Sequence, residues 1–299
     1  MDNDIDVAII GGSFAGLAAG LMLARARRRV VVFDEGLTRN RFAAEGHGFL
    51  GMDGLPPIEM QRRGQSDFLA YPTATIQRER VTAISAQDGG FRLTAAMQWR
   101  ATKVILAFGM RDVLPDIPGL ADGWGNWAMQ CPYCHGYEVA DQPTAILMTG
   151  AETPHHLTML RDWTDDLALF CNGHPLPGDL RAKAQAWGIP VYDLPVVAVR
   201  DDGASRNILL ADGREVTRSV LYLVSRAEPS CDLAAQLGCR MDQWISGPYV
   251  SVDQMQSTSV PGVFAAGDLS RTMYGALYAA ADGARAGSAA HHALLFAAG

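Results

Sequence analysis

The sequence has little positive charge for its length. Among 299 residues, 25 are Lys or Arg and 32 are Asp or Glu, so the net charge is −7. Proteins that bind nucleic acids neutralise the phosphates with a basic surface. The composition therefore argues against a nucleic-acid partner. The basic cluster at residues 25–29 is better explained as the solvated end of a helix, where cations oppose the helix dipole.

Long hydrophobic runs are also rare. Residues 7–24 carry no charge and approach the length of a membrane span, but Gly11, Gly16 and Gly20 interrupt them. The acidic start, Met1-Asp2-Asn3-Asp4, lacks the positive charge of a signal peptide. With 48% hydrophobic and 19% charged residues, the composition is typical of a globular protein with room for two domains. We expect it to be cytoplasmic, with no membrane partner.

Cysteine is scarce, and its spacing is informative. Of five cysteines, Cys171, Cys231 and Cys239 stand alone, whereas Cys131 and Cys134 are separated by two residues. Single thiols with one close pair are typical of a reducing compartment and a redox-active pair. A structural zinc ion usually needs four ligands, and the sequence has no second C-x-x-C and no H-x-x-x-H. We therefore favour a redox pair over a zinc site or two inert thiols, and predict no metal.

The residues around the pair suit thiol chemistry. Pro132 is typical of the first position of a helix, which predicts Cys131 at a helix N-terminus, where N–H groups and the dipole stabilise a thiolate. His135 follows the pair directly, and an imidazole with a pKa near ~6.5 can carry a proton to and from sulfur. The candidate catalytic residues are Cys131, Cys134 and His135.

The beginning of the chain predicts a dinucleotide-binding fold. The apolar residues 5–10 fit a buried parallel strand, and the turn Gly11-Gly12-Ser13-Phe14-Ala15-Gly16 leads into a helix that ends near Arg27. Gly11 and Gly16 take the first and third glycine positions of the Rossmann fingerprint, and Ser13 takes the second. The next strand, 30–33, ends at Asp34, which could accept hydrogen bonds from a ribose.

Three later segments fit the same domain. Residues 37–55 form a long loop that we expect to lie against the cofactor, and His47 within it is as well explained by ordinary loop hydrogen bonding as by contact with a flavin. Ala107-Phe108-Gly109 ends the first half of the domain, before a linker marked by Pro115 and Pro118. A strand ending in Gly267-Asp268 precedes a helix over 274–294.

The middle of the chain predicts a second nucleotide-type fold with an altered ligand site. A strand at 144–148 is followed by a turn, but Glu152 and His155 take the second and third glycine positions if Gly150 is the first. These side chains would crowd a pyrophosphate. No arginine follows the strand at 167–170 to pair with a 2′-phosphate. We favour a fold that has lost its nucleotide.

Together, the glycine turn, Ala107-Phe108-Gly109, Cys131-x-x-Cys134 and residues 258–268 resemble the low-molecular-weight thioredoxin reductase family over almost the whole chain. The resemblance implies an α/β fold of two Rossmann-like, three-layer ββα domains and a homodimer. The FAD domain would comprise residues 1–116 and 245–299. A pyridine-nucleotide-type domain, 117–244, would carry the cysteine pair.

Two segments look more like the small-molecule dithiol oxidases that close disulfides in gliotoxin- and holomycin-type products: residues 131–138 and 47–54. Ordinary thioredoxin reductases have an acid where His135 stands, and their glutamine near the flavin is replaced around Tyr274 and Gly275. The resemblance implies that Cys134 lies against the flavin C4a and that Cys131 exchanges with substrate.

The resulting hypothesis is an FAD-dependent thiol-disulfide oxidoreductase that oxidises a dithiol, with oxygen as the final acceptor. The substrate would be a small-molecule dithiol or disulfide, or a thioredoxin-like protein. The alternatives are an NADPH-dependent thioredoxin reductase, disfavoured by the missing NAD(P)H motifs, and a non-catalytic flavin-binding redox sensor. The predicted cofactor-binding residues are Gly11, Ser13, Phe14, Ala15, Gly16, Asp34, Glu35, Arg41, His47, Ala107, Gly109, Gly267 and Asp268.

Overall fold

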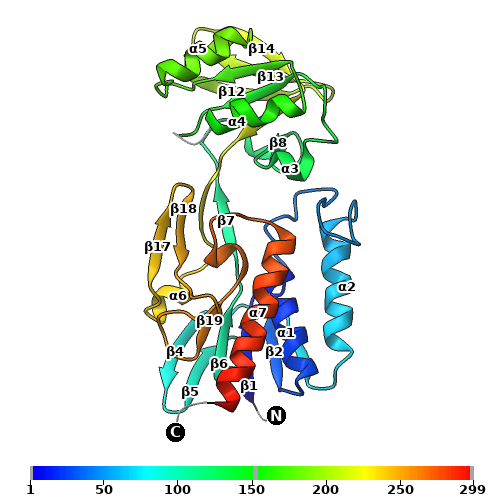
Figure 1. The fold of residues 1–299 in the computed structure, drawn as a ribbon, viewed down its shortest axis with the longest axis vertical. Coiled ribbons are helices and arrows are strands. Elements are labelled where there is room, and N and C mark those ends of the chain that lie inside the picture. Colours follow the sequence, from blue (N-terminus) through cyan, green and yellow to red (C-terminus); the bar gives the residue numbers. More distant parts are fainter. Residues whose placement is uncertain (1–2, 151–153, 297–299) are drawn as a thin grey trace. The chain divides into compact units, whose positions relative to one another are not determined.

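The structure is a computed structural model that describes residues 3–150 and 154–296. Its contacts divide the chain into two compact units. The first unit comprises Met1–Arg41, Phe49–Arg111 and Ala227–Gly299, and the second comprises Phe42–Gly48 and Asp112–Arg226. Both units combine helices with strands (Figure 1), and each contains a sheet with parallel strands, which confirms the predicted fold class. None of the helices in the described part of the chain combines the length and apolar character needed to cross a membrane.

A mainly parallel sheet forms the centre of the first unit. Its strands run in the order β3-β2-β1-β6-β5-β4, with β19 also paired to β6. The β4–β5 hairpin is antiparallel and turns at Asp88-Gly89. The strands are β1 (Asp4–Ile10), β2 (Val30–Phe33), β3 (Ala74–Gln77), β4 (Ala83–Gln87), β5 (Gly90–Thr94), β6 (Gln98–Leu106) and β19 (Val263–Ala265).

Both faces of this sheet are buried. Because successive side chains of a strand point to opposite faces, Val7 and Ile9 of β1 pack into one core cluster, and Ala8 and Ile10 pack into another. Burial on both faces explains why β1 and β2 are almost continuously apolar. The helices of the unit are α1 (Phe14–Arg25), α2 (Pro57–Leu69), α6 (Leu233–Gln236) and α7 (Ala276–Leu295), with a short 3-10 helix, η3 (Gly267–Ser270).

Helices α1 and α7 approach each other very closely (Figure 1). A β-carbon at Gly283 of α7 would lie 1.9 Å from the Ala15 carbonyl oxygen, and one at Gly287 would lie 2.5 Å from the Ala19 oxygen. Only a residue without a side chain leaves room for this approach. The glycines of α7 therefore bring the last helix against the helix that begins at the glycine turn.

The second unit has its own parallel sheet, in the order β11-β10-β9-β15-β8, and an antiparallel sheet, β12-β13-β14. The parallel strands are β8 (Ala128–Met129), β9 (Thr144–Leu147), β10 (Leu167–Phe170), β11 (Val191–Tyr192) and β15 (Val220–Leu223). The antiparallel strands are β12 (Val196–Asp201), β13 (Arg206–Leu210) and β14 (Glu215–Arg218). The helices are α3 (Pro132–His135), α4 (Pro154–Met159) and α5 (Gly178–Ala186), with 3-10 helices η1 (Ala121–Gly123) and η2 (Leu160–Asp162).

The units divide at different residues from those we predicted. The first unit resumes at Ala227, whereas we expected its second part to begin at 245. The reason is burial, because Ala227, Leu233 and Cys239 belong to a core cluster of the first unit. The remaining strands are β7 (Met110–Val113), which pairs with β16 (Arg226–Pro229), and the hairpin of β17 (Met241–Trp244) and β18 (Gly247–Val250).

Candidate active site

The glycine turn of the first unit is sterically determined. Gly11 has a φ of 105°, and a β-carbon there would lie 2.2 Å from the Ala107 carbonyl oxygen. A β-carbon at Gly16 would lie 1.8 Å from the Gly11 oxygen. Ser13 caps α1 with its backbone, and its side chain makes no capping hydrogen bond within the described part of the chain. These close approaches fix the turn that leads from β1 into α1, and the N–H groups at a helix N-terminus can bind phosphate.

The acid after β2 is buried beside this turn. Asp34 is 7% exposed, accepts a hydrogen bond from the Gly12 N–H at 3.2 Å, and pairs with Arg78 at 2.7 Å. The Gly12 N–H bonds to Oδ1 and Arg78 bonds to Oδ2, so each carboxylate oxygen still has one acceptor position available. Asp34 can therefore still accept a hydrogen bond from a ribose hydroxyl. The neighbouring Glu35 forms a surface pair with Arg80 at 2.7 Å.

The last predicted cofactor segment lies against the first. A β-carbon at Gly267, which has a φ of 76°, would lie 2.9 Å from the Ala15 β-carbon. Asp268 pairs with Arg39 at 2.9 Å, and the Arg39 guanidinium stacks 4.0 Å above the Tyr274 ring centroid. Sequence reasoning missed Arg39, whose only signal was a basic residue in the loop that we expected near the cofactor.

The other predicted cofactor residues take different surroundings. Phe14 lies at the start of α1, with its ring 5.9 Å from that of Phe49. Gly109 follows the buried Ala107 with a φ of 67°. Arg41 is exposed and donates a hydrogen bond to the Thr38 carbonyl. The structure thus gathers the glycine turn, Ala107 and Gly267 tightly, whereas Arg41 lies on a more open loop.

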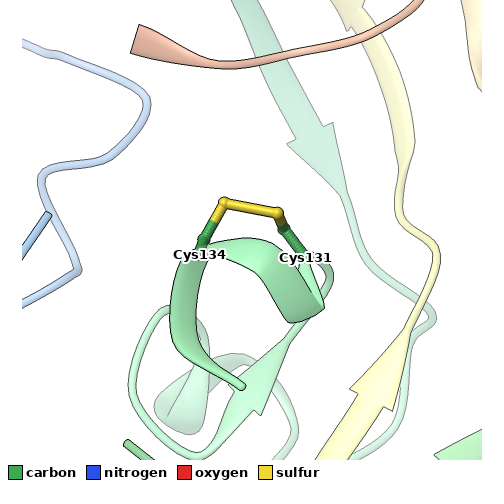
Figure 2. Close-up of a disulfide and its surroundings, with 2 residues drawn as sticks. All are labelled: Cys131 and Cys134. Atoms are coloured by element: carbon green, nitrogen blue, oxygen red, sulfur yellow. A yellow bond between two sulfur atoms is a disulfide. The ribbon is translucent and has the colours of Figure 1, made fainter. Parts of the chain in front are cut away.

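In the second unit, Cys131 and Cys134 form a disulfide across the single turn of α3, with their Cα atoms 5.3 Å apart (Figure 2). Cys131 caps the helix and Pro132 takes its first position, as the sequence predicts. The helix has four residues, so its dipole is weaker than that of a full helix. Both cysteines are half-buried, which leaves the disulfide accessible to an attacking thiolate.

Aromatic side chains flank the disulfide. Tyr133 is 76% exposed and meets Trp163 edge to face, with ring centroids 5.7 Å apart. Tyr137 is 84% exposed. In the sequence, Gly136 stands between Tyr133 and Tyr137, and a β-carbon at this position would lie 2.8 Å from the Trp163 ring nitrogen. Two exposed rings beside a redox disulfide offer apolar contacts to a bound substrate.

His135 has the environment of a neutral base. Burial is the main effect and lowers the pKa of His135 below its ordinary value, while the Glu138 carboxylate raises this pKa and His47 lowers it. The imidazole is therefore unprotonated at neutral pH and able to accept a proton.

His47 is held beside the disulfide segment. Its Nε2 lies 3.4 Å from Glu138 Oε1 and 3.6 Å from Glu45 Oε2, all within the second unit. We predicted His47 as a flavin neighbour, and contact with a flavin stays a prediction. Sequence reasoning missed Glu138 and Glu45, because acids on exposed segments carry no distinctive signal.

The nucleotide-type site of the second unit is only partly described. Glu152 lies outside the described residues, and His155 is exposed on α4. His156 points inward, and burial lowers its pKa to about 4. After β10, Asn172 accepts a hydrogen bond from the Val196 N–H at 2.9 Å. This asparagine therefore braces the loop at the position where a 2′-phosphate-binding side chain would be expected.

Comparisons of the chain with protein families, with related sequences and with solved structures agree with one another. Residues 5–152 match the model of the pyridine nucleotide-disulphide oxidoreductase family. The chain is 30% identical to thioredoxin reductase sirT of Leptosphaeria maculans, covering 95% of this chain and 92% of that protein. An oxidoreductase from Agrobacterium tumefaciens superposes with a TM-score of 0.93 at 36% identity over 99% of both chains. HlmI superposes with a TM-score of 0.91 at 35% identity, covering 99% of this chain and 94% of that one.

Proposed function

The chain belongs to the pyridine nucleotide-disulphide oxidoreductase family and is an oxidoreductase of the thioredoxin reductase type, and on this premise we propose that it oxidises dithiols to disulfides. Cys131 and Cys134 are the first electron acceptor, and FAD is the second. The observation that carries the proposal is the disulfide of Cys131 and Cys134, directly followed by the neutral base His135.

The exchange can be written with residues of this chain. A substrate thiol gives its proton to His135, and its sulfur bonds to Cys131 as the Cys131–Cys134 bond breaks and Cys134 leaves as a thiolate. The second substrate thiol loses its proton to water, and its thiolate attacks the first substrate sulfur and displaces Cys131 as a thiolate. The substrate leaves as a disulfide, and its two electrons remain on the cysteine pair. When bound, FAD would supply a two-electron acceptor for this pair, with oxygen as the final acceptor.

The first unit provides the residues for FAD. The backbone of the turn from Gly11 to Gly16 would hold the pyrophosphate at the start of α1, and Asp34 would hold a ribose, with Glu35 beside it. Gly267 and Asp268 would complete the site on the other side of α1. Ala107, Gly109, Arg41 and His47 remain proposed contacts. The homodimer that the family resemblance implies and the cytoplasmic location that the acidic start of the sequence indicates also remain proposals.

A second candidate is an NADPH-dependent reductase acting on a thioredoxin-like protein. It is supported by the intact parallel sheet of the second unit and by relatives named thioredoxin reductase. The altered glycine pattern after β9 favours the oxidase, because Glu152 and His155 stand where a pyrophosphate site has glycines. The substrate class of either candidate is a dithiol or a disulfide.

An anaerobic titration separates these functions. We expect the flavin absorbance of the purified protein to bleach on addition of a dithiol such as dithiothreitol and to persist with NADPH. Air should restore the colour with formation of peroxide. Rapid bleaching by micromolar NADPH would instead establish the reductase.

A Cys134→Ser variant tests whether the protein is an enzyme. If this variant binds a partner differently but keeps every turnover rate, the protein is a redox sensor. A colourless protein that takes up no flavin would refute both enzymatic functions.

A further inference from the structure

A short segment from the N-terminal part of the chain is built into the disulfide-bearing unit. Residues 42–48 belong to the second unit, although the chain before and after them belongs to the first. Gly125, with a φ of 79°, lets this segment pack closely, because a β-carbon there would lie 2.7 Å from the Phe42 β-carbon. Near the end of the segment, His47 lies beside Glu138, which comes three residues after His135 in the sequence.

The charges around His135 form one connected group. Glu138 faces His47 at 3.4 Å, and its carboxylate also acts on His135 and on the buried Tyr222. Glu45 is the second acid against His47, at 3.6 Å. The groups that act on His135 itself are Glu138 and His47, with opposite signs. The Glu138 carboxylate thus contacts His47 and acts electrostatically on His135.

We propose that His47 and Glu138 are positioning residues of the dithiol site, which adjust in opposite directions how readily His135 takes the proton of the substrate thiol. The inference rests on the function proposed above and adds two residues to it. In the exchange, the proton moves from the substrate S–H to a ring nitrogen of His135, and neither His47 nor Glu138 makes or breaks a covalent bond.

The physical reason is the burial of His135. A half-buried imidazolium is costly unless a negative charge lies nearby, so Glu138 stabilises the protonated form that arises during the exchange. Burial keeps His135 unprotonated before substrate arrives, and His47, which pairs with the same carboxylate, limits the stabilisation that Glu138 gives to the protonated form. A base of this kind works best when its pKa lies near the working pH.

The experiment measures the titration of His135 in the purified protein, by NMR of labelled histidine assigned with a His135→Gln variant. Glu138→Gln should move the His135 midpoint to lower pH, and His47→Gln should move it to higher pH. Each shift is expected to be on the order of half a unit, because the side chains are partly exposed to solvent. Glu138→Asp, which keeps a carboxylate, should lower the His135 midpoint less than Glu138→Gln does.

The matched control is Glu215→Gln. Glu215 is a partly exposed acid of the same unit that pairs with Arg200 at 2.8 Å, so the substitution removes a comparable ion pair. It should leave the His135 midpoint unchanged. If His47→Gln perturbs folding, the smaller His47→Asn change is measured in its place.

The rate at which dithiothreitol reduces the Cys131–Cys134 disulfide is followed over the same pH range. In each variant, the low-pH part of this rate profile should shift in the same direction as the midpoint of the His135 titration. Shifts in the same direction for both variants, or shifts no larger than that of Glu215→Gln, would overturn the inference while the wild-type protein still reacts with dithiols. A wild-type disulfide that does not react with dithiols would instead overturn the proposed function, and this role with it.

Discussion

The packing of α7 against α1 makes a Gly283→Ala substitution a sharp test of the structure. By helix propensity alone, alanine in place of a mid-helix glycine should stabilise the protein by about 1 kcal/mol. The structure predicts the opposite sign. The new β-carbon would lie 1.9 Å from the Ala15 oxygen, and an ordinary contact needs at least 3.4 Å, so the helices must separate by about 1.5 Å (3.4 minus 1.9).

The size of the stability loss depends on which atoms must move to make room for the new β-carbon. The obstructing atom belongs to the backbone of a buried helix, so no flexible side chain can give way. Overpacking of this kind costs up to about 3 kcal/mol, and subtraction of the propensity gain leaves a net loss of about 2 kcal/mol. Since Ala15 lies in the predicted pyrophosphate turn, the variant should also retain less flavin.

Gly64→Ala in α2 is the matched control. Its β-carbon would lie 3.2 Å from the Leu17 Cδ1, the end of a flexible side chain, so the propensity gain should dominate. Scanning calorimetry of both variants, with flavin content measured by absorbance, gives the comparison. A Gly283→Ala protein as stable as the wild type, or a Gly64→Ala protein destabilised to the same degree, would refute the packing.

Two further predictions concern single residues. Cys134→Ser should abolish dithiol oxidation, whereas Cys231→Ser should leave turnover unchanged, because burial raises the pKa of the Cys231 thiol and keeps it unreactive; steady-state assays with dithiothreitol decide this. His156 should make the protein less stable as the pH falls from about 6.5 to about 4, because the unfolded chain binds a proton there that the buried imidazole does not. The loss approaches roughly 3 kcal/mol below that window, and urea unfolding at several pH values should show a smaller acid dependence for His156→Leu.

Several parts of the fold could be predicted because neighbouring residues alone constrain them. The strand, turn and helix from Asp4 to Arg25 were predicted within two residues, since the glycines, the apolar run and the helical stretch all lie close together in the chain. Short strands of mixed composition, such as β3, β17 and β18, were not predicted. Their residues have weak strand preferences, and their partners in the sheet decide their conformation.

Among the contacts of the candidate site, those between neighbouring residues could also be predicted, and those between residues far apart in the sequence could not. The close spacing of Cys131 and Cys134 favours a redox pair over the alternatives, and the structure shows the two residues as a disulfide. The pairs of Arg39 with Asp268 and of His47 with Glu138 join residues far apart in the sequence, and no local pattern predicts them.

The sequence by itself thus determined the chemistry available to this protein: a redox cysteine pair, a histidine next to it, and a dinucleotide turn. It could do so because each feature lies within a few consecutive residues, whose backbone geometry is set by local sterics. Only the tertiary structure decided which charges surround His135 and where the units divide. Those properties depend on which distant segments share a buried surface, and the path of the whole chain determines that.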